Sequence, residues 1–291
     1  MLQLKVINSN VTQWDFLHAF RRQLFELVEF SLSADTQNIG TLIHGSSRSF
    51  VDDIFKYTIS WKGYGPWQQK ITDVLKGTTP SSYLFKVDWE NNTATTGTFY
   101  FRYMNGMGED VIFKLLGLDN WEQTSHSLKG MAMKFGIGQP VSVGIRANNT
   151  ESIPVSVYYD IGKLKIPDAM SITTAVTELM QWPADSILRM NETLMVISRV
   201  CQPQYMALDP SNAVIKINYP KVSVQDFYRF MDLFNTEASR KNEVRSICRQ
   251  WKQPFLNYLG IKFNQCECGW KAYLVISHQH TATDFSYTLK L

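Results

Sequence analysis

The sequence predicts an α+β fold in which a closed antiparallel barrel of about ten strands is ringed by helices. Three observations lead to it: an amphipathic helical segment opens the chain, five pairs of β-type runs follow, and segments with helical periodicity separate the pairs. A hairpin followed by one or two helices thus recurs as a structural repeat. An open sheet is the alternative, and we favour closure because it removes both exposed edges. Residues 1–291 are expected to form this single domain.

The opening helix is predicted over residues 12–32, where apolar side chains recur every three or four residues. These side chains are Phe16, Phe20, Leu24, Leu27 and Phe30. Such a stripe is typical of a helix that packs one face against a core.

Each of the five predicted hairpins joins two β-type runs across a polar turn. They pair residues 39–44 with 55–61, 83–89 with 97–104, 141–146 with 153–160, 204–208 with 213–219, and 271–277 with 283–291. Helical periodicity occurs at residues 67–76, 110–135, 170–200 and 224–259. Side chains just fill a barrel of about eight strands, so a wider barrel should enclose a cavity.

Alternation along the strands predicts which side chains line that cavity, because successive residues point to opposite faces of a sheet. Placing the apolar alternates toward the helices turns polar side chains inward from four runs, although the orientation of the run at 97–103 is ambiguous. These are Lys56, Thr58 and Ser60; Thr98, Tyr100 and Arg102; Ser156 and Tyr158; and Lys216 and Asn218.

Three of these inward side chains, Lys56, Arg102 and Lys216, are cations from different hairpins. Burying a cation without a partner costs on the order of several kcal/mol of folding free energy, so the arrangement predicts an anionic ligand. Lys86 could join the cluster, as could Arg48, although Arg48 stands in a predicted turn. The alternative is that each cation reaches solvent at a barrel end or pairs with an acidic residue.

Composition narrows the range of partners. The 29 Lys and Arg against 26 Asp and Glu leave a net charge of +3, too balanced for a protein that binds nucleic acid through its phosphates. The sequence shows neither a membrane span nor a signal peptide, so we expect a cytoplasmic protein. We also expect it to be a monomer or a weak homodimer. The C-x-C at 266–268 and the H-x-H at 278–280 lack the partners of a metal motif, and hydrolase, P-loop and zincin motifs are absent.

The order of one helix and five hairpins, with several short fragments, resembles the αββα aromatic prenyltransferases, whose barrel holds an isoprenyl diphosphate and an aromatic acceptor. The fragments are FKYTIS at 55–60, FKVDW at 85–89, VSVYY at 155–159, and QYMAL at 204–208 followed by IKINY at 215–219. The likeness covers nearly the whole chain and includes no long signature.

The resemblance implies roles for individual side chains. Tyr158 stands where relatives shield the allylic cation, and Tyr205 and Lys216 fall on a tyrosine and a basic diphosphate ligand. Thr98 stands where relatives carry a diphosphate-binding Lys, so Arg102 or Lys86 would substitute. The last hairpin has Asp284 and Thr288 in place of a Lys and a Tyr, with Lys271 and Lys290 as its basic residues.

The resemblance also bears on metal. Lys56 stands where metal-dependent relatives carry a magnesium-ligating Asp, so no cofactor is expected to be required. The alternative keeps magnesium on the diphosphate, with help from Asp53 or Asp88. The candidate site is therefore Tyr100, Tyr158 and Tyr205 around the cation and Lys56, Thr58, Lys86, Arg102 and Lys216 around the diphosphate.

The predicted function is Friedel–Crafts-type transfer of an isoprenyl group, dimethylallyl in the first instance, from its diphosphate to an indole or phenol, as in indole alkaloid secondary metabolism. Preorganised Lys and Arg stabilise the leaving diphosphate, and aromatic faces stabilise the carbocation. Two alternatives stay open: a prenyltransferase acting on Tyr or Trp of a cyclic peptide, and a non-catalytic barrel that binds a small molecule or peptide.

Overall fold

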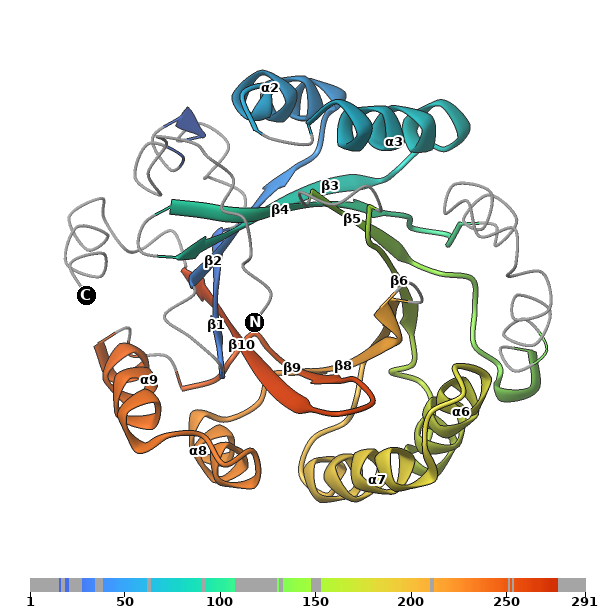
Figure 1. Cartoon of the computed structure of the whole chain (residues 1–291), viewed down its shortest axis with the longest axis vertical. Helices are drawn as coiled ribbons and strands as arrows, with labels where there is room; N and C mark the ends of the chain where they lie inside the picture. The colour runs from blue at the N-terminus through green and yellow to red at the C-terminus, as the bar shows by residue number, and fades with distance from the viewer. Residues whose placement is uncertain are drawn as a thin grey trace.

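The computed structural model shows a closed ten-stranded barrel with helices packed around its outside (Figure 1). It describes residues 16, 19–20, 28–34, 39–61, 64–90, 93–107, 130, 133–147, 153–209, 212–250, 252 and 254–276. In this part of the chain, no helix is long and apolar enough to cross a membrane.

The strands follow one another around the barrel in chain order, and each is antiparallel to its neighbours. They are β1 (Val28–Ser33), β2 (Ile39–Gly45), β3 (Ser82–Glu90), β4 (Thr93–Arg102), β5 (Ser142–Ala147), β6 (Val155–Asp160), β7 (Tyr205–Asp209), β8 (Val214–Pro220), β9 (Tyr258–Phe263) and β10 (Cys268–Ile276). Pairing of β1 with β10 closes the sheet and sets Phe30 opposite Leu274. The predicted closed antiparallel barrel is confirmed.

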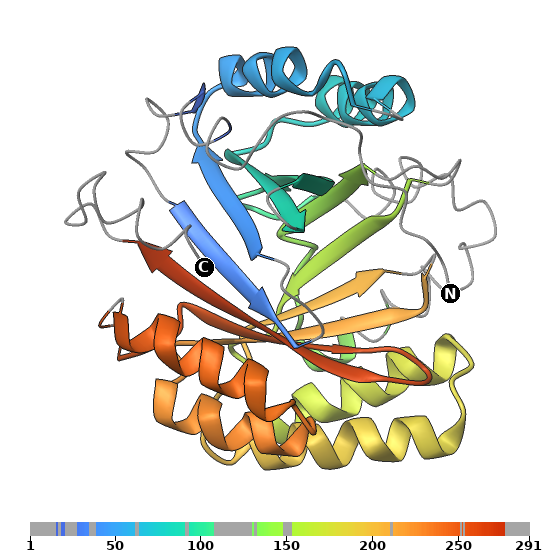
Figure 2. The same cartoon turned by 60° about the vertical axis from the view of Figure 1, so that its left-hand side comes forward.

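The helices lie outside the barrel in pairs that connect one hairpin to the next (Figures 1 and 2). They are α2 (Arg48–Thr58) with α3 (Tyr64–Gly77), α6 (Ile166–Leu179) with α7 (Ala184–Ser198), and α8 (Val224–Leu233) with α9 (Ala238–Gln250). The predicted helical segment 67–76 lies within α3, and segment 170–200 divides at Pro183, which caps α7. Most of segment 110–135 lies outside the described residues.

The predicted strand at residues 55–61 is wrong, because this segment lies in α2 and the turn after it. Val51, Ile54 and Thr58 are buried at the three- and four-residue spacing of a helix. The side chains of Lys56 and Thr58 therefore do not point into the barrel. The inference that Lys56 replaces a magnesium ligand is wrong for the same reason.

The first and last hairpins each begin earlier in the chain than predicted. β1 occupies the end of segment 12–32, which was expected to be helical, and pairs with β2. β9 begins at Tyr258, within segment 224–259, and pairs with β10, while residues 283–291 lie outside the described residues. The run V-E-F-S-L-S alternates as a strand does, although its Phe30 also continues the helical spacing of the preceding residues.

Alternation within the strands separates an apolar outer face from a polar inner face. In β4, Phe99 and Phe101 are fully buried among core side chains, whereas Tyr100 and Arg102 line the barrel interior. Trp67 of α3 packs its ring centroid 6.5 Å from that of Phe99. The hydrophobic core thus lies between sheet and helices, and most of the residues with polar side chains on the strands' other face line the interior, together with Leu42 and Leu84.

Candidate functional site

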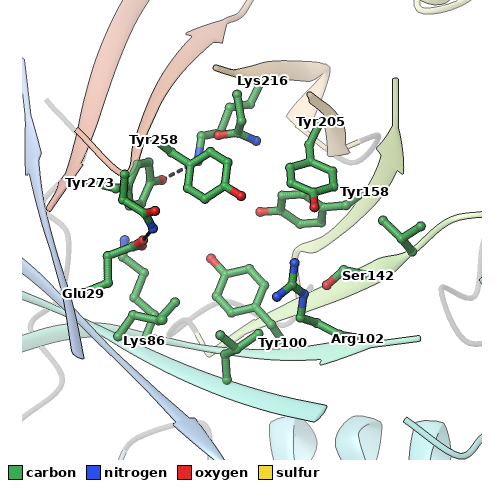
Figure 3. Close-up of a pocket in the computed structure, with 15 residues that line it drawn as sticks. Glu29, Lys86, Tyr100, Arg102, Ser142, Tyr158, Tyr205, Lys216, Tyr258 and Tyr273 are labelled. Atoms are coloured by element: carbon green, nitrogen blue, oxygen red, sulfur yellow. Dashed lines mark hydrogen bonds between the residues drawn. The ribbon is translucent and has the colours of Figure 1, made fainter. Parts of the chain in front are cut away.

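The barrel encloses a cavity of about 330 Å³, to which all ten strands contribute side chains (Figure 3). The lining residues are Glu29, Leu42, Leu84, Lys86, Tyr100, Arg102, Val141, Ser142, Tyr158, Tyr205, Lys216, Asn218, Asn257, Tyr258 and Tyr273. Twelve of these fifteen residues carry a polar group in the side chain, and Leu42, Leu84 and Val141 are the apolar ones. The predicted internal cavity is therefore present.

The cavity lies toward the barrel end at which the helical connections join the strands. Arg102 ends β4, while Ser142, Tyr205 and Tyr258 begin β5, β7 and β9. Arg102 is paired with Ser142 in the β4–β5 register, and its guanidinium points into the cavity in Figure 3.

Lys216 of β8 points into the cavity, and its ammonium group donates a hydrogen bond to the Tyr273 hydroxyl of β10. The Nζ atom also lies 4.4 Å from the centroid of the Tyr273 ring. Burial lowers the pKa of Lys216 to about 7, and the charges of Lys271 and Arg146 contribute in the same direction. The attraction of Glu29 opposes this shift without cancelling it. An anion entering the cavity would therefore find an ammonium group that lacks full compensation.

A second buried lysine, Lys86 of β3, belongs to a chain of charges. The Asp88 carboxylate accepts a hydrogen bond from Lys86 Nζ at 2.6 Å and another from Lys271 Nζ of β10 at 2.9 Å. The Thr96 hydroxyl donates to its other oxygen at 3.1 Å. Burial alone would raise the pKa of Asp88, but the ammonium groups of Lys271 and Lys86 outweigh it and hold that pKa well below its usual range. This bridge joins β3 to β10 across the intervening β1 and β2.

Five tyrosines line the cavity and provide its aromatic surfaces (Figure 3). The Tyr100 and Tyr158 rings meet edge to face, with centroids 5.9 Å apart and an interplanar angle of 72°. The Tyr205 and Tyr258 rings lie 6.1 Å apart. Burial raises the pKa of Tyr100, Tyr158, Tyr258 and Tyr273, so these phenols stay neutral.

Glu29 of β1 is a cavity residue that the sequence analysis missed. Its carboxylate accepts a hydrogen bond of 2.6 Å from the side-chain amide of Asn257. Burial raises the pKa of Glu29, opposed by this hydrogen bond and by the charge of Lys216. Its alternation with Phe30 and Leu32, which are buried in the core, is the sequence signal that identifies Glu29 as inward-facing, but the helical spacing of the preceding residues obscures it.

The structure brings six of the eight predicted site residues together in the cavity: Lys86, Tyr100, Arg102, Tyr158, Tyr205 and Lys216. The other two lie on α2. The Lys56 side chain is 79% exposed and pairs with Asp53 at 3.7 Å, and the buried Thr58 hydroxyl donates to the carbonyl of Ile54. Asn257, Tyr258 and Tyr273 are lining residues that the sequence analysis did not identify as part of the site.

The cavity is better suited to an anion than to magnesium. In the described part of the chain, no group of three or more His, Cys, Asp and Glu side chains could hold a metal ion. Glu29 is the carboxylate among the cavity-lining residues. Asp88 is hydrogen-bonded to the lining residue Lys86, and both of its carboxylate oxygens already accept hydrogen bonds. Two lysines, one arginine, one serine and five tyrosines line the cavity, and their ammonium, guanidinium and hydroxyl groups can donate hydrogen bonds to phosphate oxygens.

No protein-family model matches the chain, and no curated protein matches its sequence. Solved structures do match its fold. 5-Dimethylallyltryptophan synthase from Streptomyces coelicolor has a TM-score of 0.60 at 10% identity, covering 85% of this chain and 80% of that one. AnaPT from Neosartorya fischeri has a TM-score of 0.60 at 8% identity, covering 85% of this chain and 77% of that one. PriB in its binary complex with product diphosphate has a TM-score of 0.59 at 10% identity, covering 85% of this chain and 79% of that one. The resemblance inferred from the sequence is thus confirmed for the fold: this chain has the αββα barrel of the aromatic prenyltransferases.

Proposed function

We propose that the protein is an aromatic prenyltransferase that moves a short isoprenyl group, dimethylallyl in the first instance, from its diphosphate to an indole or phenol. The observation that carries the proposal is the cavity, where the incompletely compensated ammonium of Lys216 faces a set of tyrosine rings. Two structural neighbours support it: the Streptomyces synthase in complex with DMASPP and Trp, and PriB in complex with product diphosphate.

The cations of the cavity would bind the diphosphate. Lys216, Arg102 and Lys86 come from three strands and line one lumen. When the allylic carbon–oxygen bond breaks, its electron pair leaves with the diphosphate, and fixed cations stabilise that charge as it develops. Because these cations are held in place by the barrel, they need little reorganisation during the reaction.

The tyrosines would protect the allylic cation that remains. Each ring face can stabilise a cation by about 0.5 to 2 kcal/mol, and together they keep water from the reacting carbon. In Figure 3 the Tyr100 and Tyr258 rings lie on opposite sides of the lumen, and the rings of Tyr158 and Tyr205, their respective neighbours, lie at the side between them. An arene held against this cation would form the new carbon–carbon bond at high effective concentration.

Glu29 would bind the aromatic substrate that accepts the isoprenyl group. Asn257 holds its carboxylate at the cavity wall, where it can accept a hydrogen bond from an indole N–H or a phenol O–H. Such a bond increases the electron density of the ring that attacks the cation. Restoring aromaticity after the attack releases one ring proton, and a buried carboxylate whose pKa is raised is a suited acceptor for it.

The test is to incubate the protein with labelled dimethylallyl diphosphate and a panel of indoles, phenols and cyclic peptides, and to analyse the products by mass spectrometry. We expect one dimethylallyl group to be added to an indole or phenol with release of diphosphate. Products on cyclic peptides alone would favour the peptide prenyltransferase. A parallel thermal-shift assay should show stabilisation by dimethylallyl or geranyl diphosphate; stabilisation by neither, with no product, would favour a non-catalytic barrel.

A further inference from the structure

Three glycines on the inner face of the barrel lie directly beneath long polar side chains. They are Gly40 of β2, Gly144 of β5 and Gly260 of β9, and each shares the inward alternation of a cavity-lining residue two positions away on its own strand. A glycine in a strand weakens it, and often marks a place where another group approaches the backbone closely.

Gly260 lies beneath Lys216. In the β8–β9 register Gly260 faces Asn218, so Lys216 crosses it diagonally. A Cβ atom on Gly260 would overlap Lys216 Cε, and would come within 3.1 Å of Lys216 Nζ and 2.9 Å of Asn218 Oδ1. The backbone of Gly260 does not require glycine, because its φ is not in the positive region. Close approach of the lysine is therefore the reason for the missing side chain.

The other two inner glycines show the same relation. A Cβ atom on Gly40 would lie 2.2 Å from Ser31 Oγ and 2.7 Å from Lys86 Cε, and one on Gly144 would lie 2.8 Å from Tyr100 Cε1. Lys86 and Tyr100 therefore approach the backbone of these glycines more closely than a side chain at either position would allow. Gly269 of β10 provides the contrast: it has the same alternation as Tyr273, but a Cβ atom there would meet no atom within 4 Å.

We propose that Gly260 is a positioning residue, which seats Lys216 against the barrel wall so that its ammonium reaches Tyr273 and faces the diphosphate of the donor. The proposal rests on the proposed function. With a methyl group at position 260, the lysine stem would be displaced into the lumen, where the ammonium would lose its place beside Tyr273 and occupy space needed by the donor. Gly260 itself touches neither substrate, so it acts through Lys216.

Binding of inorganic diphosphate, measured by isothermal titration calorimetry, tests this directly. Misplacing one charge-assisted hydrogen bond costs about 1.5 to 3 kcal/mol, so Gly260→Ala should weaken binding about 10- to 100-fold. The matched variant Gly269→Ala makes the same chemical change in open space and should bind like the wild type. Wild-type affinity in Gly260→Ala would overturn the positioning role alone. Absence of diphosphate binding by the wild type would overturn the proposed function, and this role with it.

A double-mutant cycle separates the seat for Lys216 from general damage to the strand. If Gly260 acts through Lys216, adding Gly260→Ala to Lys216→Ala should weaken diphosphate binding no further. An equal loss in both backgrounds would contradict the proposal. In steady-state assays of Gly260→Ala, KM for dimethylallyl diphosphate should rise while KM for the arene stays constant; a rise in both would indicate only a distorted barrel.

Folding gives a second readout if Gly260→Ala alone is unstable. The overlap is mainly with the lysine stem, so truncating that stem should relieve it. The Gly260→Ala, Lys216→Ala double variant should then have a higher Tm than Gly260→Ala. An equally low Tm in both would show that the glycine is needed for the backbone or for Asn218, and would overturn the proposal.

Discussion

Lys86 and Lys216 both project from the inner face of the barrel and both line its cavity, yet their surroundings differ. Lys86 contacts the Asp88 carboxylate, which also binds Lys271. Lys216 donates to the neutral hydroxyl of Tyr273, and Lys271 and Arg146 repel its charge. Burial lowers the pKa of both lysines, so each is held charged only at a cost.

The surroundings of Lys86 and Lys216 therefore indicate different roles, structural for the first and ligand-binding for the second. The bridge of Lys86, Asp88 and Lys271 carries its own counter-charge and ties β3 to β10 across the barrel. Among the described residues, no carboxylate is hydrogen-bonded to Lys216, so this region would gain from an anion. We therefore expect variants of the bridge to affect stability first, and variants around Lys216 to affect catalysis first.

The largest expected effect follows Asp88→Asn. This variant leaves two ammonium groups together without their carboxylate, and breaking a buried ion pair in this way costs about 3 to 5 kcal/mol of the free energy of unfolding. Urea denaturation measures it. The control is Asp53→Asn at the exposed Lys56 pair, where the change should stay below about 1 kcal/mol. Equal stability of the Asp88 variant and the wild type would show that the bridge does not stabilise the barrel.

Lys216→Ala should reduce turnover while leaving the fold in place. Loss of a cation that stabilises the leaving diphosphate costs about 2 to 4 kcal/mol in the transition state, or roughly 30- to 1000-fold. Assays with dimethylallyl diphosphate and an accepted arene measure the loss. Lys56→Ala removes the same type of side chain from the outside of the barrel and should leave turnover unchanged. Wild-type kinetics in Lys216→Ala would show that the diphosphate binds elsewhere.

The depressed pKa of Lys216 predicts that donor binding takes up a proton. The groups that influence it are Glu29 of β1, Asp88 of β3, Arg146 of β5 and Lys271 of β10, with the Tyr273 hydroxyl. The lysine loses its charge as pH rises through about 7, and a bound diphosphate raises its pKa again. Affinity should therefore fall with rising pH above 7, by at most roughly tenfold per pH unit for one proton.

Calorimetry in buffers of different ionisation enthalpy measures that proton, which should be missing in Lys216→Ala. The unfolded chain binds this proton up to a pKa of about 10.4, so between pH 7 and 10 the unfolded state holds more protons than the native state. The contribution of Lys216 to stability should therefore rise with pH across this window. A fall across it, or proton uptake that persists in the variant, would contradict the assignment.

A smaller effect is expected at Tyr158. Replacing its ring by Leu removes one face that can stabilise the allylic cation, at a cost of about 0.5 to 2 kcal/mol, or roughly 2- to 30-fold in turnover. Tyr158→Phe keeps the ring and should retain most of the rate. If the two variants lose the same activity, the hydroxyl rather than the ring is the functional group.

Chelation should have the smallest effect. We expect turnover to persist in excess EDTA, because Lys216, Arg102 and Lys86 line the cavity and would supply positive charge to a diphosphate bound there. Addition of millimolar MgCl₂ should then change the rate little. Nearly complete loss in EDTA with recovery on adding magnesium would mean that the ion accompanies the diphosphate, with Glu29 as the nearest available carboxylate of the cavity lining.

The sequence was sufficient for the fold class and for the site residues on long alternating strands. Tyr100 and Arg102 alternate with Phe99 and Phe101 in a strand-type run, so the strand could be predicted, whereas the packing of Phe99 against Trp67 of α3 shows which of its faces points outward. Lys56 could not be placed, because its segment satisfies both periods and packing against the sheet selects the helix. The Asp88–Lys271 contact joins residues 183 positions apart and depends on closure of the barrel, which no local pattern encodes.

The central claim is that the barrel interior binds the diphosphate of an isoprenyl donor through Lys216. Titration of dimethylallyl diphosphate and of uncharged dimethylallyl alcohol into the wild type and Lys216→Ala tests it most directly. We expect saturable binding of the diphosphate by the wild type, binding at least about tenfold weaker in Lys216→Ala, and no measurable binding of the alcohol by either. Equal affinity of both proteins for the diphosphate, or equal affinity of the wild type for diphosphate and alcohol, would contradict it.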